Sequence, residues 1–274
     1  MFKEEQIHFP QSEIKTMLVP VSTGCPYNKC TFCAMYTGDA YSEIPLQDME
    51  YELLNGDPYT DRVFLTGADP LAVGFERMSK ILKLIHKYFP YCGCVAAYAS
   101  VRTVHKYSTE ELAELHKAGL GLLYIGFETG SEEVLKFVQK GHTVAQAVET
   151  GKKLNEAKLP FNSIIMYGLA GEGKCVENAR QTAAMLNQFD SSKIVTMNLT
   201  IFETTELSEM TKNGTFIPAG SEEKLEELKT LLQNLEARKT TEFDTTHATN
   251  IIKMTGSLPG EKERLLEHIE DLKK

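Results

Sequence analysis

Three cysteines lie within nine residues near the N-terminus, in the stretch STGCPYNKCTFCAMY, which runs from Ser22 to Tyr36. Their spacing is C-x4-C-x2-C, at Cys25, Cys30 and Cys33. Thiolate sulfur is a soft ligand that suits zinc and iron–sulfur clusters. The chain has six cysteines, and its first fifteen residues are of mixed charge, so we expect no secretory leader. In a large chain of this kind, clustered thiols indicate metal binding or catalysis rather than disulfides.

The number of available ligands separates the candidate metal centres. Structural zinc nearly always takes four protein ligands, and residues 34–85 contain neither cysteine nor histidine. An iron–sulfur cube held by three thiolates leaves one iron open to another ligand. The spacing favours an iron–sulfur centre, while zinc or a group of buried thiols stays open. A third hypothesis is a thiol oxidoreductase that uses Cys30 and Cys33 as a C-x2-C pair, which leaves Cys25 without a role.

Six short apolar runs alternate with helical patterns and must position this cysteine loop. The runs are mostly continuous rather than alternating, which is typical of parallel strands covered by helices. Right-handed βαβ crossovers between such strands give either a partial (β/α)6 barrel or a doubly wound open sheet. We expect an α/β fold with a partial (β/α)6 barrel and a C-terminal extension. The predicted strands span residues 16–22, 61–67, 94–100, 122–129, 161–169 and 193–202.

The helical segments have recognisable start residues. Ser108 with Glu111, and Thr143 with Gln146, have the spacing of capping boxes. No GxGxxG motif follows the first strand and no glycine–lysine phosphate loop is present, which disfavours dinucleotide and P-loop nucleotide binding. In parallel α/β folds the loops after the strands build the active site, and the cysteine loop follows the first strand. The predicted helices cover residues 72–88, 108–119, 131–141, 143–158, 175–189 and 221–239.

Length, composition and charge limit the architecture and the partners. A chain of 274 residues, 42% of them hydrophobic, suits a single barrel domain. We expect residues 1–15 as an N-terminal segment, 16–240 as the barrel, and 241–274 as a C-terminal cap made of a loop and a terminal helix. The net charge of −9 disfavours nucleic acid, and no apolar run is long enough for a membrane span. A small-molecule or peptide substrate, no membrane and a cytoplasmic location follow as expectations.

The cysteine loop resembles the cluster-binding loop of radical S-adenosylmethionine (radical SAM) enzymes. Most of these enzymes have three residues between the first two cysteines, whereas this chain has four. Phe32, just before the third cysteine, matches an aromatic position that lies near the adenine in the family. The stretch IGFETGSEEVLKFVQKGHT, residues 125–143, strongly resembles the subgroup of oxygen-independent coproporphyrinogen oxidases and tRNA methylthiotransferases. The resemblance extends over about residues 18–218.

This resemblance implies specific binding roles. Glu128 would face the ribose hydroxyls of SAM, and Lys140 would pair with its methionyl carboxylate, since a carboxylate accepts from a diol and a cation pairs with an anion. Outside the resemblance, the two residues have ordinary explanations as a strand-end acid and a helix-end lysine. The backbone at Gly168 would approach the adenine. The stretch TGAD resembles a glycine-rich motif whose backbone receives the methionyl amino group, and it comprises Thr66, Gly67, Ala68 and Asp69.

The resemblance also implies a reaction. Cys25, Cys30 and Cys33 would hold a [4Fe–4S] cluster whose open iron binds SAM. One electron from a reducing partner such as flavodoxin or ferredoxin would cleave SAM to methionine and a 5′-deoxyadenosyl radical, which abstracts hydrogen from a substrate. The substrate is not indicated by any motif. An alternative to an enzyme is a non-catalytic α/β barrel that binds zinc or an iron–sulfur cluster and has a role in regulation or assembly.

Overall fold

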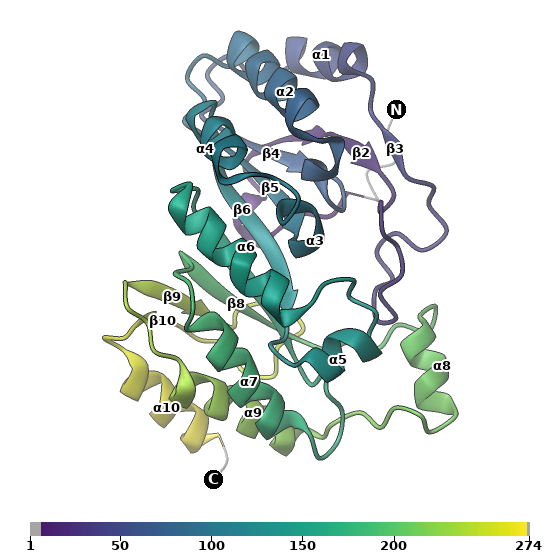
Figure 1. Cartoon of the computed structure of the whole chain (residues 1–274), viewed down its shortest axis with the longest axis vertical. Helices are drawn as coiled ribbons and strands as arrows, with labels where there is room; N and C mark the ends of the chain where they lie inside the picture. The colour runs from purple at the N-terminus through teal and green to yellow at the C-terminus, as the bar shows by residue number, and fades with distance from the viewer. Residues whose placement is uncertain (1–6, 273–274) are drawn as a thin grey trace. The chain divides into compact units, whose positions relative to one another are not determined.

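The computed structural model describes residues 7–272, and its strands and helices alternate along the chain (Figure 1). The main sheet has the open order β1-β4-β5-β6-β7-β8-β9-β10. The pairs β1–β4, β4–β5, β7–β8 and β8–β9 are parallel, and β9 pairs with β10 antiparallel. This mostly parallel, unclosed arrangement confirms the predicted α/β partial barrel. The strands are β1 (Met17–Pro20), β4 (Arg62–Thr66), β5 (Cys94–Ser100), β6 (Leu120–Glu128), β7 (Phe161–Tyr167), β8 (Lys193–Asn198), β9 (Thr241–Asp244) and β10 (Thr255–Leu258).

Helices follow most of the strands. Ser108 begins α4 with a complete capping box: its Oγ accepts from the Glu111 amide at 3.1 Å, and the Glu111 carboxylate accepts from the Ser108 amide at 2.8 Å. The same reciprocal bonds join Thr143 and Gln146 ahead of α6, as predicted. The helices are α1 (Leu46–Leu54), α2 (Phe75–Tyr88), α3 (Val101–Val104), α4 (Thr109–Lys117), α5 (Glu132–Phe137), α6 (Val144–Glu156), α7 (Cys175–Leu186), α8 (Glu206–Lys212), α9 (Ser221–Asn234) and α10 (Lys262–Asp271), with 3-10 turns η2 (Gln11–Glu13) and η3 (Pro70–Val73).

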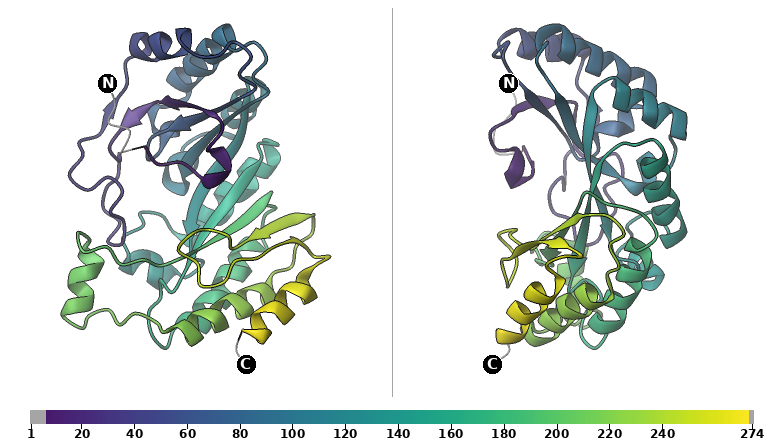
Figure 2. Two further views of the ribbon diagram at one scale, coloured as in Figure 1. Left: turned by 180° about the vertical axis from the view of Figure 1, so that it is seen from behind. Right: turned by 90° about the vertical axis from the view of Figure 1, so that its left-hand side faces the viewer.

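The C-terminal segment differs from the expected loop. β9 pairs in parallel with β8, and β10 returns antiparallel to β9 before α10 begins (Figure 2). These two strands have four residues each and carry many polar side chains, so they give no apolar run to detect. Asn250 fixes the connection between them, because its amide donates to the Thr196 and Thr245 carbonyls at 2.7 Å each. Small elements β2 (Ser22–Thr23), β3 (Ser42–Glu43), α1, α3 and α8 were also not predicted.

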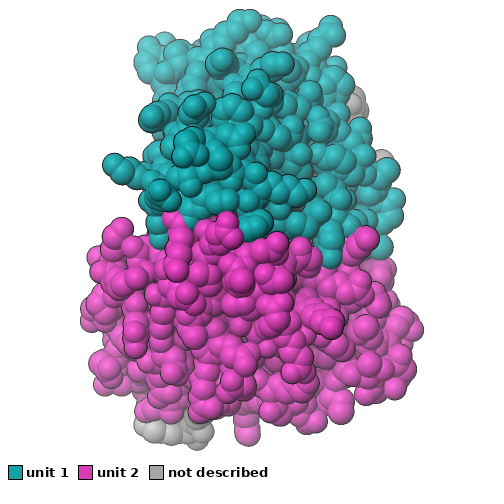
Figure 3. All heavy atoms as spheres, viewed as in Figure 1, with its two compact units in different colours: residues 1–28, 35–125, 153–161 teal, residues 29–34, 126–152, 162–274 magenta. Residues whose placement is uncertain are grey.

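The chain divides into two compact units (Figure 3). Unit 1 comprises residues 1–28, 35–125 and 153–161, and unit 2 comprises 29–34, 126–152 and 162–274. The cysteine loop passes from one unit to the other, so Cys25 belongs to unit 1 while Cys30 and Cys33 belong to unit 2. The single-domain organisation stays a prediction. Residues 1–6 of the predicted N-terminal segment and residues 273–274 of the predicted cap lie outside the described residues.

An aromatic cluster and a buried ion pair organise the interior of unit 1. Phe64, Tyr98 and Tyr124 come from three neighbouring strands and make edge-to-face contacts with ring centroids 5.3–6.0 Å apart. Glu13, in η2, is almost fully buried and accepts two hydrogen bonds from Arg62, at 2.6 and 2.8 Å, and one from Tyr124 at 2.7 Å. These charge-assisted bonds attach the N-terminal turn to the sheet of unit 1.

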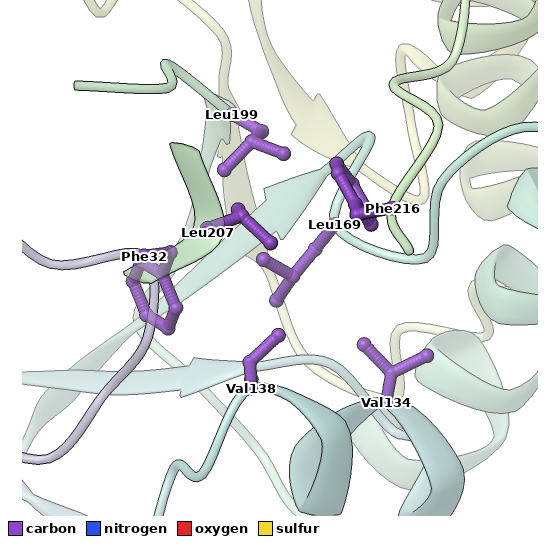
Figure 4. Packing of buried hydrophobic residues seen from close by; sticks show 7 residues of the cluster. All are labelled: Phe32, Val134, Val138, Leu169, Leu199, Leu207 and Phe216. Carbon is purple, nitrogen blue, oxygen red and sulfur yellow. The ribbon is translucent and has the colours of Figure 1, made fainter. Parts of the chain in front are cut away.

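A hydrophobic cluster in unit 2 packs directly against the second half of the cysteine loop (Figure 4). Cys30 and Cys33 are partly buried against this cluster. Farther along the chain, α9 packs beside α7 and α10 beside α9 (Figure 1). Unit 2 therefore supplies an apolar wall for the thiols. The buried members of the cluster are Phe32, Val134, Val138, Leu169, Leu199, Leu207 and Phe216.

Candidate functional site

Each of the three predicted ligand cysteines is half-buried, and none forms a disulfide. In unit 1 the Asn28 amide donates to Cys25 Sγ at 3.3 Å, and hydrogen bonds of this type tune cluster thiolates. Asn28 adopts φ 46°, a left-handed conformation that bends the loop between the first two cysteines. Within residues 7–272, no group of three or more His, Cys, Asp or Glu side chains has the geometry of a metal site. The ligand set therefore stays a prediction.

Backbone and apolar contacts hold the second half of the loop in unit 2. The Thr31 amide donates to the Val138 carbonyl at 3.1 Å, and the Thr31 carbonyl accepts from the Leu207 amide at 2.9 Å. Phe32 is 9% exposed and packs in the hydrophobic cluster. The position of Phe32, the residue expected near the adenine, is therefore fixed by these contacts.

Glu128 and Lys140 lie together although twelve positions separate them. Lys140 Nζ is 2.5 Å from Glu128 Oε1, with only 14% and 8% of the two side chains exposed. The Lys140 ammonium also lies 5.8 Å from the centroid of the Phe32 ring, within cation–π range. The structure thus brings together three residues that the sequence analysis assigned to SAM binding.

Electrostatics keep Lys140 charged. Burial alone would lower the pKa of Lys140, but the Glu128 carboxylate and the Cys30 and Cys33 sulfurs outweigh it and raise this pKa above its ordinary value. The Lys140 ammonium is therefore a buried cation within electrostatic reach of the Cys30 and Cys33 sulfurs. The local field in unit 2 therefore suits anionic sulfur and an anionic group of a ligand.

Backbone conformation makes room for this ion pair. Glu128 ends β6 with φ 63°, and Gln139, directly before Lys140, has φ 51°. Positive φ is uncommon for residues with a side chain and occurs often at functional sites. A Cβ at Gly126 would come within 2.5 Å of Glu128 Oε1 and 3.1 Å of Lys140 Nζ. The absence of a side chain at Gly126 leaves the space that the pair occupies.

The glycine-rich stretch lies in unit 1 at the end of β4. Thr66 and Gly67 are buried and Ala68 is half-buried. Gly67 has φ 132°, and a Cβ there would come within 2.7 Å of Ser22 Oγ. The position therefore needs glycine, both for its conformation and for its close approach to the chain after β1. These features fit the predicted backbone role, which stays a prediction.

Asp69 has a structural role through its side chain. It is 3% exposed, and its Oδ2 accepts hydrogen bonds of 2.6 Å from the hydroxyls of Ser100 and Thr103. Burial raises the pKa of this carboxyl, and the two hydroxyl donors oppose the rise. Ser100 also caps α3, which places Arg102 4.4 Å above the ring of Tyr27 in the cysteine loop. Asp69 therefore organises the end of β5.

Gly168, expected to face the adenine, follows β7 with φ 80°. Its amide donates to Glu227 Oε2 at 2.7 Å, and a Cβ there would come within 2.7 Å of Lys224 Cε. Sequence reasoning missed Glu227, which is 2% exposed on α9. The available signal was its position four residues before the buried Leu231, which places an acid on the apolar face of the helix.

The fold and the site geometry fit known proteins. Residues 19–183 match the model of the radical SAM superfamily. The chain is 24% identical over 192 residues to heme chaperone HemW from Bacillus subtilis, covering 68% of this chain and 48% of that protein. It is 24% identical over 245 residues to tRNA uridine(34) acetyltransferase from Methanocaldococcus infernus, covering 74% and 46% respectively. Coproporphyrinogen III oxidase (HemN) from Escherichia coli is structurally similar, with a TM-score of 0.61, 17% identity, and coverage of 80% of this chain and 51% of that one.

The chain belongs to the radical SAM superfamily, because the matched model covers more than half of its length. This membership confirms the predicted class, whose chemistry uses SAM and a [4Fe–4S] cluster. The chain spans about half the length of the curated relatives it matches. Among the described residues, the helices are too short or too polar to cross a membrane.

Proposed function

We propose that Cys25, Cys30 and Cys33 hold a [4Fe–4S] cluster and that the chain uses SAM to abstract hydrogen from a small-molecule or peptide substrate. The observation that carries this proposal is the buried Lys140–Glu128 pair beside Phe32 in unit 2. Burying an ion pair costs desolvation free energy, and buried charges of this kind cluster at functional sites. Family membership supplies the class of chemistry.

The residues present fit the cluster and SAM. Three thiols without disulfides provide soft donors, and each thiolate of a cube binds a different iron, so the sulfurs need not converge on one ion. When bound, these cofactors supply a hydrogen-abstracting radical through one-electron cleavage of the sulfonium. Reduction would come from a partner such as flavodoxin or ferredoxin, in keeping with a cytoplasmic location.

The role of the protein is to bind and orient SAM and to exclude water from the site. Lys140 would hold the methionyl carboxylate and Glu128 the ribose hydroxyls, each through charge-assisted hydrogen bonds. The apolar cluster around Phe32 would keep water from the thiols. Exclusion of water would in turn strengthen every electrostatic contact within the site. Gly67 and Gly168 carry no side chain of their own, so a ligand could approach their backbone closely.

Metal content after anaerobic reconstitution with iron and sulfide tests the ligand set. We expect about four irons per chain, and we expect Cys25→Ala, Cys30→Ala and Cys33→Ala each to lose most of them. Cys94→Ala is the matched control, since this thiol lies in β5 and should leave iron content unchanged. One tetrahedral zinc per fresh chain, with iron binding insensitive to these substitutions, would support the non-catalytic alternative instead.

A further inference from the structure

A buried hydrogen-bonded network in unit 2 connects helix α9 to two strand ends. Glu227 Oε2 accepts from the Gly168 amide at 2.7 Å, and Glu227 Oε1 accepts from the Asn178 side-chain amide at 2.7 Å. Asn178 Oδ1 in turn accepts from the Thr129 hydroxyl. Glu227, Asn178 and Thr129 are at most 4% exposed. One carboxylate therefore fixes the residue after β7 and, through Asn178, the residue after Glu128.

The same network continues along the chain beyond β6. The Ser131 amide donates to Thr129 Oγ1 at 3.0 Å, and the Gly130 amide donates to Thr182 Oγ1 at 2.9 Å. Adding a Cβ at Gly130 would bring it within 2.3–2.7 Å of the backbone of α7, so this turn packs tightly on the helix. These contacts hold the backbone directly after Glu128, which itself adopts φ 63°.

We propose that Glu227 is a positioning residue that sets the distance between the two strand ends that bind the adenosine of SAM. The inference rests on the proposed function, which assigns the ribose to Glu128 and the adenine to Gly168. One carboxylate bonds the residue after β7 directly and the residue after Glu128 through Asn178, so the position of Glu227 constrains the distance between the two strand ends. Glu227 lies outside residues 19–183, the part matched by the superfamily model.

The polarity of the network allows a swap that preserves the hydrogen bonds joining Gly168, position 227, position 178 and Thr129. Asn178→Asp alone places a carboxylate against Glu227 and repels it. In the double variant Asn178→Asp/Glu227→Gln, the new glutamine oxygen accepts from the Gly168 amide and its NH2 group donates to the new carboxylate at position 178. That carboxylate still accepts from the Thr129 hydroxyl. The negative charge moves by one residue while the geometry is retained.

The test measures the dissociation constant for SAM and the melting temperature of reconstituted protein. Asn178→Asp should weaken SAM binding about tenfold or more, the cost of losing one charge-assisted hydrogen bond. The double variant should return to within about threefold of the unmodified chain. Glu222→Gln, on the exposed side of α9, is the matched control and should change neither quantity. Amide hydrogen exchange at Gly168 should accelerate in Asn178→Asp and recover in the double variant.

Parallel measurement of Glu128→Gln separates two kinds of failure. If Glu128→Gln weakens SAM binding but Asn178→Asp lowers only the melting temperature, the network has a merely structural role and the inference is overturned. If the double variant stays as weak as Asn178→Asp, the positioning inference is likewise wrong. If Glu128→Gln leaves SAM binding unchanged, the proposed adenosine site itself is wrong, and the inference falls with it.

Discussion

Single residues in unusual backbone conformations shape the candidate site. Glu128 and Gln139 adopt positive φ, and each lies at or next to a member of the buried ion pair. Gly67 lies at φ 132°, where a side chain is strained and would meet Ser22. Such conformations persist only where the surroundings enforce them. The conformations of these single residues therefore determine which backbone groups a ligand can reach.

Gly67→Ala should destabilise the chain by about 2 kcal/mol, because it adds backbone strain and a steric clash with Ser22. Gly74→Ala is the matched control: its φ of 83° imposes strain, but no atom lies within 4 Å of the added Cβ. It should cost about 1 kcal/mol. Urea unfolding measures both free energies. Equal costs for the two variants would contradict the close approach at Gly67.

His142 gives a prediction for pH dependence. Burial, reinforced by the charge of Lys140, lowers the pKa of His142 to about 3. The unfolded chain has a histidine pKa of about 6.5, so below that pH the unfolded state binds one more proton than the folded state. Stability from this residue is therefore lost as the pH falls from about 6.5 towards 3.

His142→Gln should remove this loss. We expect the decrease in unfolding free energy between pH 7 and pH 5 to be smaller in the variant by about 2 kcal/mol. Urea unfolding at the two pH values measures it. His268→Gln serves as the control, because this histidine lies on the exposed side of α10. The same decrease in His142→Gln as in the unmodified chain would show that His142 titrates normally in the folded state.

At the scale of elements, a capping box formed by two nearby residues fixes the N-terminal end of helix α4. Ser108→Ala removes the side-chain half of the capping box, which leaves the Glu111 amide without its acceptor. We expect a loss of about 1 kcal/mol in unfolding free energy. Thr109→Ala removes the neighbouring hydroxyl, which makes no cap, and should change stability by less than about 0.5 kcal/mol. Comparable losses for both would refute the cap.

The elements also show what sequence could reveal. Continuous apolar runs predicted β4 to β8, and capping patterns predicted the starts of α4 and α6, because both signals are local. The short strands β9 and β10 have no such pattern; pairing with β8 creates them. The contact between Glu128 and Lys140 depends on the conformation of the segment that joins them. The contact between Gly168 and Glu227 depends on the packing of α9, because 59 positions separate the two residues in the sequence. Spacing identifies candidate residues but not such long-range contacts.

At the scale of the whole molecule, the family match fixes the chemistry while the substrate stays a proposal. Two of the similar proteins have very different functions, a heme chaperone and a tRNA acetyltransferase, and the chain spans only about half of each. The net charge of −9 opposes binding to a polyanion through long-range repulsion. A small-molecule or peptide substrate therefore remains the better proposal.

Product analysis after reduction tests the central claim most directly. The reconstituted chain is reduced with dithionite under anaerobic conditions in the presence of SAM, and 5′-deoxyadenosine and methionine are quantified. We predict equal amounts of the two products from the unmodified chain and none from Cys30→Ala. Intact SAM after incubation with a chain that holds a full, reduced cluster would contradict the account.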